Sequence, residues 1–139
     1  MEKTIKKISG YFDALEFWNS CELGKPVVKD TEVIIPASHI EIFEDHPLNQ
    51  TGRPIIWGES KLVFGGVRRS DRVVFEYLGD PKSGGGFKRS YQISDGPFAL
   101  VDEPVMTFVF EGILLEPLSY VTWEIDSVSF HLEVEESIA

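Results

Sequence analysis

The sequence has few of the features that mark membrane proteins, secreted proteins and cysteine-based metal sites. Its one cysteine, Cys21, can form neither a disulfide within the chain nor a zinc site of several cysteines. No apolar run approaches the roughly 20 residues of a membrane helix, and none long enough for a signal peptide follows the N-terminal lysines. We therefore expect a cytoplasmic protein without a membrane span, in which Cys21 is a small buried side chain.

Basic side chains are missing from the last third of the chain. The 139 residues carry a formal net charge of −10. Residues 95–139 contain ten carboxylates and no lysine or arginine, whereas residues 68–89 contain six basic side chains and three acids. Nucleic acids and anionic membranes both require a basic surface, so we expect neither as a partner.

This uneven charge has two interpretations. In the first, the basic residues of 68–89 pair with acidic strands across a sheet. In the second, an acidic face binds another, basic protein, because opposite charges speed association and select partners. The second interpretation makes four carboxylates the candidate partner-binding residues: Glu124, Asp126, Glu133 and Glu135.

Alternation of apolar and polar residues is the main structural signal. Apolar side chains occupy every second position in Ser127–Val134, which is typical of a half-buried antiparallel strand. Tyr120–Asp126 repeats the pattern with the opposite parity. The change of parity predicts a bulge or a turn at Asp126-Ser127.

The middle of the chain predicts further strands. Leu62–Leu78 is interpreted as a hairpin with a polar turn at Val67–Arg72, and Phe87–Ile93 as another strand. Thr31–Phe43 is expected to be one strand, bent or interrupted at Pro36, because proline removes a backbone donor. Two turn-rich stretches, 45–52 and 79–86, are expected to be loops.

Residues 11–21 fit two structures. As a helix they carry a polar stripe of Asp13, Glu16 and Ser20 and end at Gly24. As a strand they alternate, with an apolar set of Leu15, Phe17, Cys21 and Leu23. We favour the strand slightly, because Gly24-Lys-Pro26 then forms a turn into the next strand.

These patterns together predict one domain over residues 1–139. The length suits a single domain, and six to ten short strands with frequent turns suit a mainly β fold. We expect an antiparallel β-sandwich or a partly closed barrel, with at most one short helix near the N-terminus.

Motifs for chemistry are weak. His39, Glu41 and His46 could bind zinc or non-haem iron, but their spacing matches no strong signature. The glycine-rich stretch 79–86 lacks the Lys-Ser/Thr and the helix of a phosphate-binding loop. No nucleophile motif surrounds Cys21 or any serine, and we expect no cofactor.

Aromatic residues offer one further candidate. Trp18, Trp57 and Trp123 are the three tryptophans. Trp123 lies on an apolar face and is expected in the core. Trp57, in Ile55-Ile-Trp-Gly58, could be exposed and stack on a sugar or another small ligand, although large aromatic side chains more often pack in a core.

The order of several segments is similar to that of a group of bacterial proteins. Tyr11-Phe-Asp-Ala-Leu15, His46-Pro-Leu-Asn49 and Leu62-Val-Phe-Gly-Gly-Val67 follow one another. In this, the first half of the chain resembles short, acidic, β-rich bacterial proteins that include immunity proteins of toxin–immunity pairs. Phe12 stands where that group usually has a histidine. The resemblance implies a non-catalytic protein that binds and blocks a toxin, and it assigns no residue a role.

Enzymatic activity stays open, but the sequence favours a non-catalytic protein-binding domain. The leading hypothesis is an immunity-type inhibitor of a cationic protein. One alternative is a module that binds carbohydrate or another small ligand through exposed aromatic residues. The other is a metal-dependent enzyme that uses His39, Glu41 and His46. The oligomeric state is left open.

Overall fold

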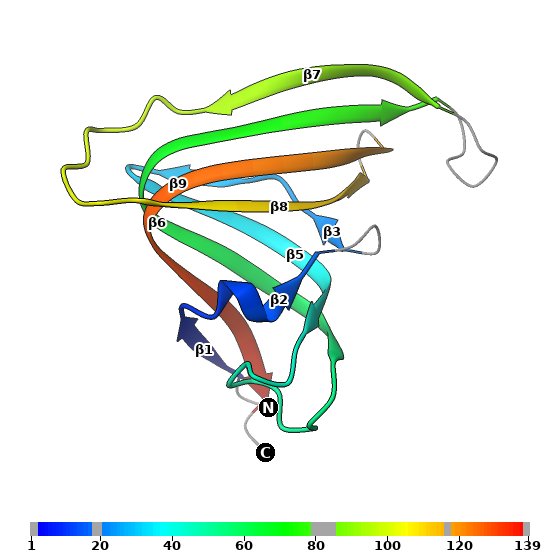
Figure 1. The fold of residues 1–139 in the computed structure, drawn as a ribbon, viewed down its shortest axis with the longest axis vertical. Coiled ribbons are helices and arrows are strands. Elements are labelled where there is room, and N and C mark those ends of the chain that lie inside the picture. Colours follow the sequence, from blue (N-terminus) through cyan, green and yellow to red (C-terminus); the bar gives the residue numbers. More distant parts are fainter. Residues whose placement is uncertain (1–2, 18–20, 79–85, 116–117, 138–139) are drawn as a thin grey trace.

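The computed structural model describes residues 3–17, 21–78, 86–115 and 118–137. The chain is mainly β, as predicted, and its sheet is not closed into a regular barrel (Figure 1). No helix in this described part is long and apolar enough to span a membrane. The elements are β1 Lys3–Ser9, the 3-10 turn η1 Phe12–Ala14, β2 Leu15–Glu16, β3 Glu22–Leu23, β4 Val27–Lys29, β5 Glu32–Ile42, β6 Ile55–Tyr77, β7 Phe87–Asp95, β8 Met106–Leu115 and β9 Leu118–Ser137.

Two long strands, β6 and β9, organise the molecule. They pair antiparallel from Lys61↔Glu133 to Glu76↔Ser119 and bend together in the middle. In one half of the bent sheet β6 also pairs with β5, and β9 with β1; in the other half β6 pairs with β7, and β9 with β8. The two halves face each other and enclose the core.

Aromatic side chains fill the space between the two halves. Phe64 of β6 lies 5.7 Å from Phe110 of β8, and Phe130 of β9 lies 5.7 Å from Phe108 of β8, measured between ring centroids. Phe12 of η1 adds a ring 5.1 Å from Phe130. These contacts join strands that are far apart in the sequence, so burial of aromatic area holds the halves together.

The hairpin expected in Leu62–Leu78 is wrong, because β6 runs through Val67–Arg72 without a turn. Gly65-Gly66 lies at the bend, where Gly66 has a φ of +62°. The polar residues that suggested a turn stay in the strand because their charges find partners on β9 and β7, as described below. The bend therefore replaces the turn.

The polar step Asp126-Ser127 of β9 is not a turn, and the bulge beside it lies on β6. The strand is continuous, and its register with β6 shifts between Val67↔Ser127 and Arg69↔Asp126, which leaves Arg68 as an extra residue on β6. Along β9 the buried parity changes after Ser127, because Ser127 is itself buried and Val128, predicted to point inward, is only partly buried. The buried set is Val121, Trp123, Ile125, Phe130, Leu132 and Val134.

β5 covers most of Thr31–Phe43 without an interruption. Pro36 keeps its place opposite Lys61, and its carbonyl accepts a hydrogen bond of 2.8 Å from the N–H of Gly24. The strand changes parity at His39, whose φ is +64°. Ile35 and Ala37 point inward before this residue, and Ile40 and Ile42 do so after it.

Neither structure predicted for residues 11–21 holds over the whole segment. A 3-10 turn at Phe12–Ala14 leads into the two-residue strand β2, and residues 18–20 lie outside the described part. The apolar set of the strand interpretation is nevertheless buried: Leu15, Phe17, Cys21 and Leu23. Burial raises the pKa of the Cys21 thiol to about 12, as expected of a packed side chain and not of a nucleophile.

Candidate functional site

The four acidic residues predicted to bind a partner separate into two pairs. Glu124 and Asp126 lie on β9 beyond the bend, beside the second half of β6. Glu133 and Glu135 lie on the other side of the bend, beside the first half of β6 and β1. The two pairs have different surroundings and must be considered separately.

Glu124 and Asp126 surround an arginine of this chain. The Arg69 Nε atom donates to Asp126 Oδ2 over 2.9 Å, and Arg69 Nη2 donates to Glu124 Oε1 over 2.6 Å. Arg69 Nη1 reaches Asp71 Oδ2 at 3.0 Å, and the Thr107 hydroxyl donates to Asp126 Oδ1 at 2.6 Å. For this pair the structure therefore confirms the first interpretation, in which the charges pair across the sheet.

The arginine lowers the pKa of the Asp126 carboxyl, through its hydrogen bond first and that of Thr107 second. A carboxyl with a depressed pKa in the folded state stabilises the protein above its unfolded pKa of about 3.9. That stabilisation is lost as the pH falls through the lower, folded value. The Asp126 side chain is 19% exposed, so the contact is partly shielded from water.

Asp126→Asn should lower the free energy of unfolding by about 1 kcal/mol at pH 7. At pH 3 the difference from the unmodified protein should be smaller, because the stabilisation decreases once the pH falls below the unfolded pKa. Urea unfolding at the two pH values measures both quantities. Asp102→Asn, at an exposed position, is the control and should have little effect at either pH; a pH-independent cost for Asp126→Asn would contradict the assignment.

Two other basic residues of 68–89, Arg72 and Arg89, also pair within the chain. Arg72 Nη2 donates to Asp95 Oδ1 over 3.3 Å, and its guanidinium carbon lies 4.8 Å from the centroid of the Trp123 ring. Arg89 donates two hydrogen bonds to the Glu76 carboxylate, and this bidentate ion pair lowers the pKa of Glu76. The basic segment is thus largely used to join β6, β7 and β9.

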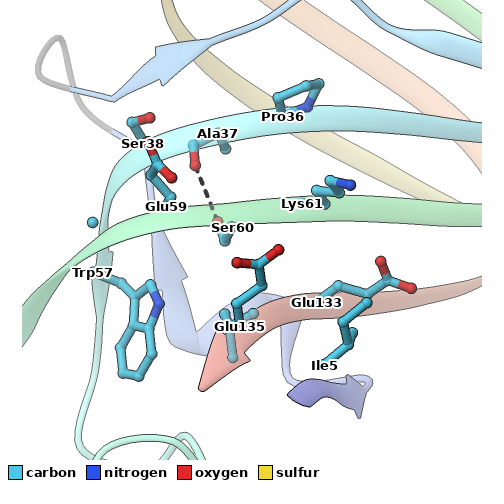
Figure 2. Close-up of a pocket in the computed structure, with 12 residues that line it drawn as sticks. Ile5, Pro36, Ala37, Ser38, Trp57, Glu59, Ser60, Lys61, Glu133 and Glu135 are labelled. Carbon is cyan, nitrogen blue, oxygen red and sulfur yellow. Dashed lines mark hydrogen bonds between the residues drawn. The ribbon is translucent and has the colours of Figure 1, made fainter. Parts of the chain in front are cut away.

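Glu133 and Glu135 belong to a groove on the other side of the bend. The β6–β9 ladder stops at Lys61↔Glu133. From there, within the described residues, β6 continues paired with β5 and β9 continues paired with β1. A groove of about 620 Å³ opens where they separate, and Figure 2 shows its lining. The lining residues are Ile5, Pro36, Ala37, Ser38, Trp57, Gly58, Glu59, Ser60, Lys61, Glu133, Val134 and Glu135.

The groove combines an aromatic ring with several carboxylates. Trp57 is half-buried, and Glu59 and Glu135 are exposed. Glu133 is 19% exposed and lies 3.6 Å from the Lys7 ammonium and 3.1 Å from His131 Nε2. Lys61 supplies the one ammonium of the lining. Trp57 also packs partly against the core. An aromatic ring and carboxylates that line the same groove both attract cationic groups.

The groove unites residues that the sequence placed in separate hypotheses. Trp57 was a candidate for stacking on a ligand, and Glu133 and Glu135 were candidates for binding a protein. The sequence analysis missed Glu59 and Gly58. Alternation along β6 could not have placed Glu59, because Trp57 lies opposite the buried Ile40 and packs against the core, whereas Glu59 lies opposite Ser38 on the outer face.

The predicted metal site is wrong for the described residues. They contain no group of three or more His, Cys, Asp or Glu side chains that could hold a metal ion. His39 is exposed at its positive φ. His46 is 1% exposed in the loop after β5, where its Nδ1 accepts from the Leu48 N–H at 3.1 Å and burial lowers its pKa. Glu41 stays on β5 opposite Glu16.

The tryptophans differ in their surroundings. Trp123 is 1% exposed in the core, as predicted. Trp18 lies outside the described residues. Trp57 is therefore the described tryptophan that a ligand can reach.

Comparisons with known proteins add no name. No family model, no curated protein and no solved structure matches this chain. The groove is consequently interpreted from its own geometry and charge.

Proposed function

We propose that this chain is a binding protein whose groove between β6 and β9 accepts a basic segment of another protein. The observation that carries the proposal is that Trp57, Glu59, Glu133 and Glu135 line one groove where the β6–β9 ladder ends. The lining has three carboxylates and the ammonium of Lys61, and Lys7 beside it pairs with Glu133. A lysine or arginine of the partner could contact the ring and a carboxylate together.

The net charge of the chain supports the same partner. A charge of −10 attracts a basic protein over a long range and speeds encounter at low salt. As the class of partner we propose a cationic toxin that the chain blocks by binding. The support for this finer step is the resemblance of the first half to bacterial immunity proteins, together with the sign of the charge.

The proposal predicts that two charge reversals in the groove abolish capture of the partner. Glu59→Lys with Glu135→Lys should reduce the amount captured from a lysate of the source cells by at least tenfold. The matched control is Asp102→Lys with Glu103→Lys, which changes the net charge equally at exposed positions outside the groove. Immobilised wild-type protein and both variants are compared by quantitative mass spectrometry.

Each outcome of the capture has a clear meaning. A basic protein held by the wild type and the control, and lost from the groove variant, supports the proposal. Equal retention by all three proteins places the contact elsewhere. If the wild type retains no protein above the level of the blank resin, the binding function is contradicted.

The half-buried Trp57 favours a second candidate, a carbohydrate-binding module. A sugar would stack on the indole face, so its binding would be lost in Trp57→Ala and kept in the double charge reversal. A basic protein segment would be lost in both. A glycan array probed with these two variants distinguishes the candidates.

A further inference from the structure

Where β6 and β9 line the groove, one backbone edge of each strand faces it. Along residues 55–60, β6 has β5 on one side, and along residues 134–137, β9 has β1 on one side. On the sides that face the groove, these stretches have no strand partner among the described residues. Such edges present backbone N–H and C=O groups that another strand can pair with.

Gly58 marks the place where a second backbone can approach. It lies within β6 and lines the groove, and a Cβ built on it would meet no heavy atom within 4 Å. A glycine inside a strand often marks close approach by a ligand or another chain. Gly58 is exposed and opposite the irregular His39 of β5, so no side chain covers the strand backbone at this point of the groove.

We propose that the groove binds its partner as an extended strand that inserts between β6 and β9 and restores the ladder. Main-chain pairing of this kind supplies affinity, and alternate side chains supply specificity. The inference rests on the proposed function, because it describes how the same groove holds its basic partner.

The charges of the lining define the sequence of the inserted strand. Side chains of a strand point alternately to opposite faces. Lysine or arginine at every second position would place the cations on the face of Glu59, Glu133 and Glu135, with apolar residues between them. A second copy of this acidic chain is disfavoured as the occupant because both copies carry a charge of −10.

Two peptides of equal charge test the mode of binding. The first is acetyl-Arg-Val-Arg-Val-Arg-Val-amide, and the second carries N-methyl groups on its three valines, which removes the backbone donors along one edge. Calorimetry with the whole chain should give a Kd at least tenfold lower for the first peptide. Gly58→Tyr, which projects a ring into the open space, should weaken that binding at least tenfold while the melting temperature changes little.

The outcomes separate the inference from the proposed function. If both peptides bind with equal affinity, strand insertion is wrong. If the variant with Glu59→Lys and Glu135→Lys then binds both peptides more weakly, recognition by charge is still supported. Unchanged binding by a folded Gly58→Tyr variant would also overturn the inference. If neither peptide binds, strand insertion of a basic segment is wrong, and the capture experiment alone then decides the proposed function.

Discussion

Asp95→Ala should lower the free energy of unfolding by about 3 kcal/mol, because it leaves a buried arginine without its counter-charge. The side chains of Asp95 and Arg72 are 8% and 14% exposed. The same carboxylate accepts a hydrogen bond of 2.9 Å from Ser70, whose hydroxyl oxygen accepts one of 3.0 Å from Trp123 Nε1. Loss of Asp95 therefore removes an ion pair and loosens a buried network.

The position of Arg72 makes relaxation difficult. Its Nε atom is buried and has no hydrogen-bond partner within the described part of the chain, and its guanidinium lies over the Trp123 ring. Arg72→Met combined with Asp95→Ala should cost less than Asp95→Ala alone, since replacing both charges leaves none stranded. Urea unfolding measures both variants.

An exposed pair provides the control for this prediction. Glu124→Ala removes one carboxylate from Arg69, whose side chain is 37% exposed, and should cost at most about 1 kcal/mol. A loss below 1 kcal/mol for Asp95→Ala, or an equal loss for Glu124→Ala, would show that the buried pair does not hold β7 to β6.

Gly66→Val should also destabilise the protein by about 3 kcal/mol, through two causes at the same position. A β-branched residue is strained at a φ of +62°. In addition, a Cβ at Gly66 would lie 2.7 Å from Cγ2 and 2.9 Å from Cβ of Val128. Because β6 and β9 bend together here, neither strand can move aside without disturbing the other.

Gly58→Ala is the matched control on the same strand. Gly58 is not among the positive-φ glycines, and an added Cβ there meets open space, so the change should alter stability by less than about 1 kcal/mol in either direction. Chemical denaturation of both variants gives the comparison. A Gly66→Val variant as stable as the wild type would contradict the role assigned to the bend.

The buried faces of the strands could be predicted because they depend on local alternation. Most inward residues of β9 followed from the sequence, and Trp123 was correctly placed in the core, but Val128 was expected to point inward and is only partly buried. Burial on one face enforces a period of two, and that period is visible without knowing which strand lies beside it.

The continuous course of β6 could not be predicted, because distant partners decide it. Val67–Arg72 has the polar composition of a turn. It remains a strand because Arg69 reaches Asp126, which lies 57 positions away in the sequence. Local composition contains no information about such a pairing.

The groove could not be predicted from the sequence, for a related reason. It exists because the β6–β9 ladder ends at Lys61↔Glu133, and a register of pairing is a property of the folded sheet. The sequence offered Trp57, Glu133 and Glu135 as separate candidates and did not indicate that they line one groove. It also predicted Glu124 and Asp126 as partner-binding residues, although both form ion pairs with Arg69 in the structure.

Photo-crosslinking from position 57 tests the proposed binding groove most directly. Trp57 is replaced by p-benzoylphenylalanine in the whole chain, and Met106 of β8, which is 55% exposed and outside the groove, is replaced in the control. Both proteins are irradiated in a lysate of the source cells, and the adducts are identified by mass spectrometry. We predict an adduct with a basic protein from position 57 and none with that protein from position 106. The absence of an adduct at position 57, or the same adducts from both positions, would contradict the account.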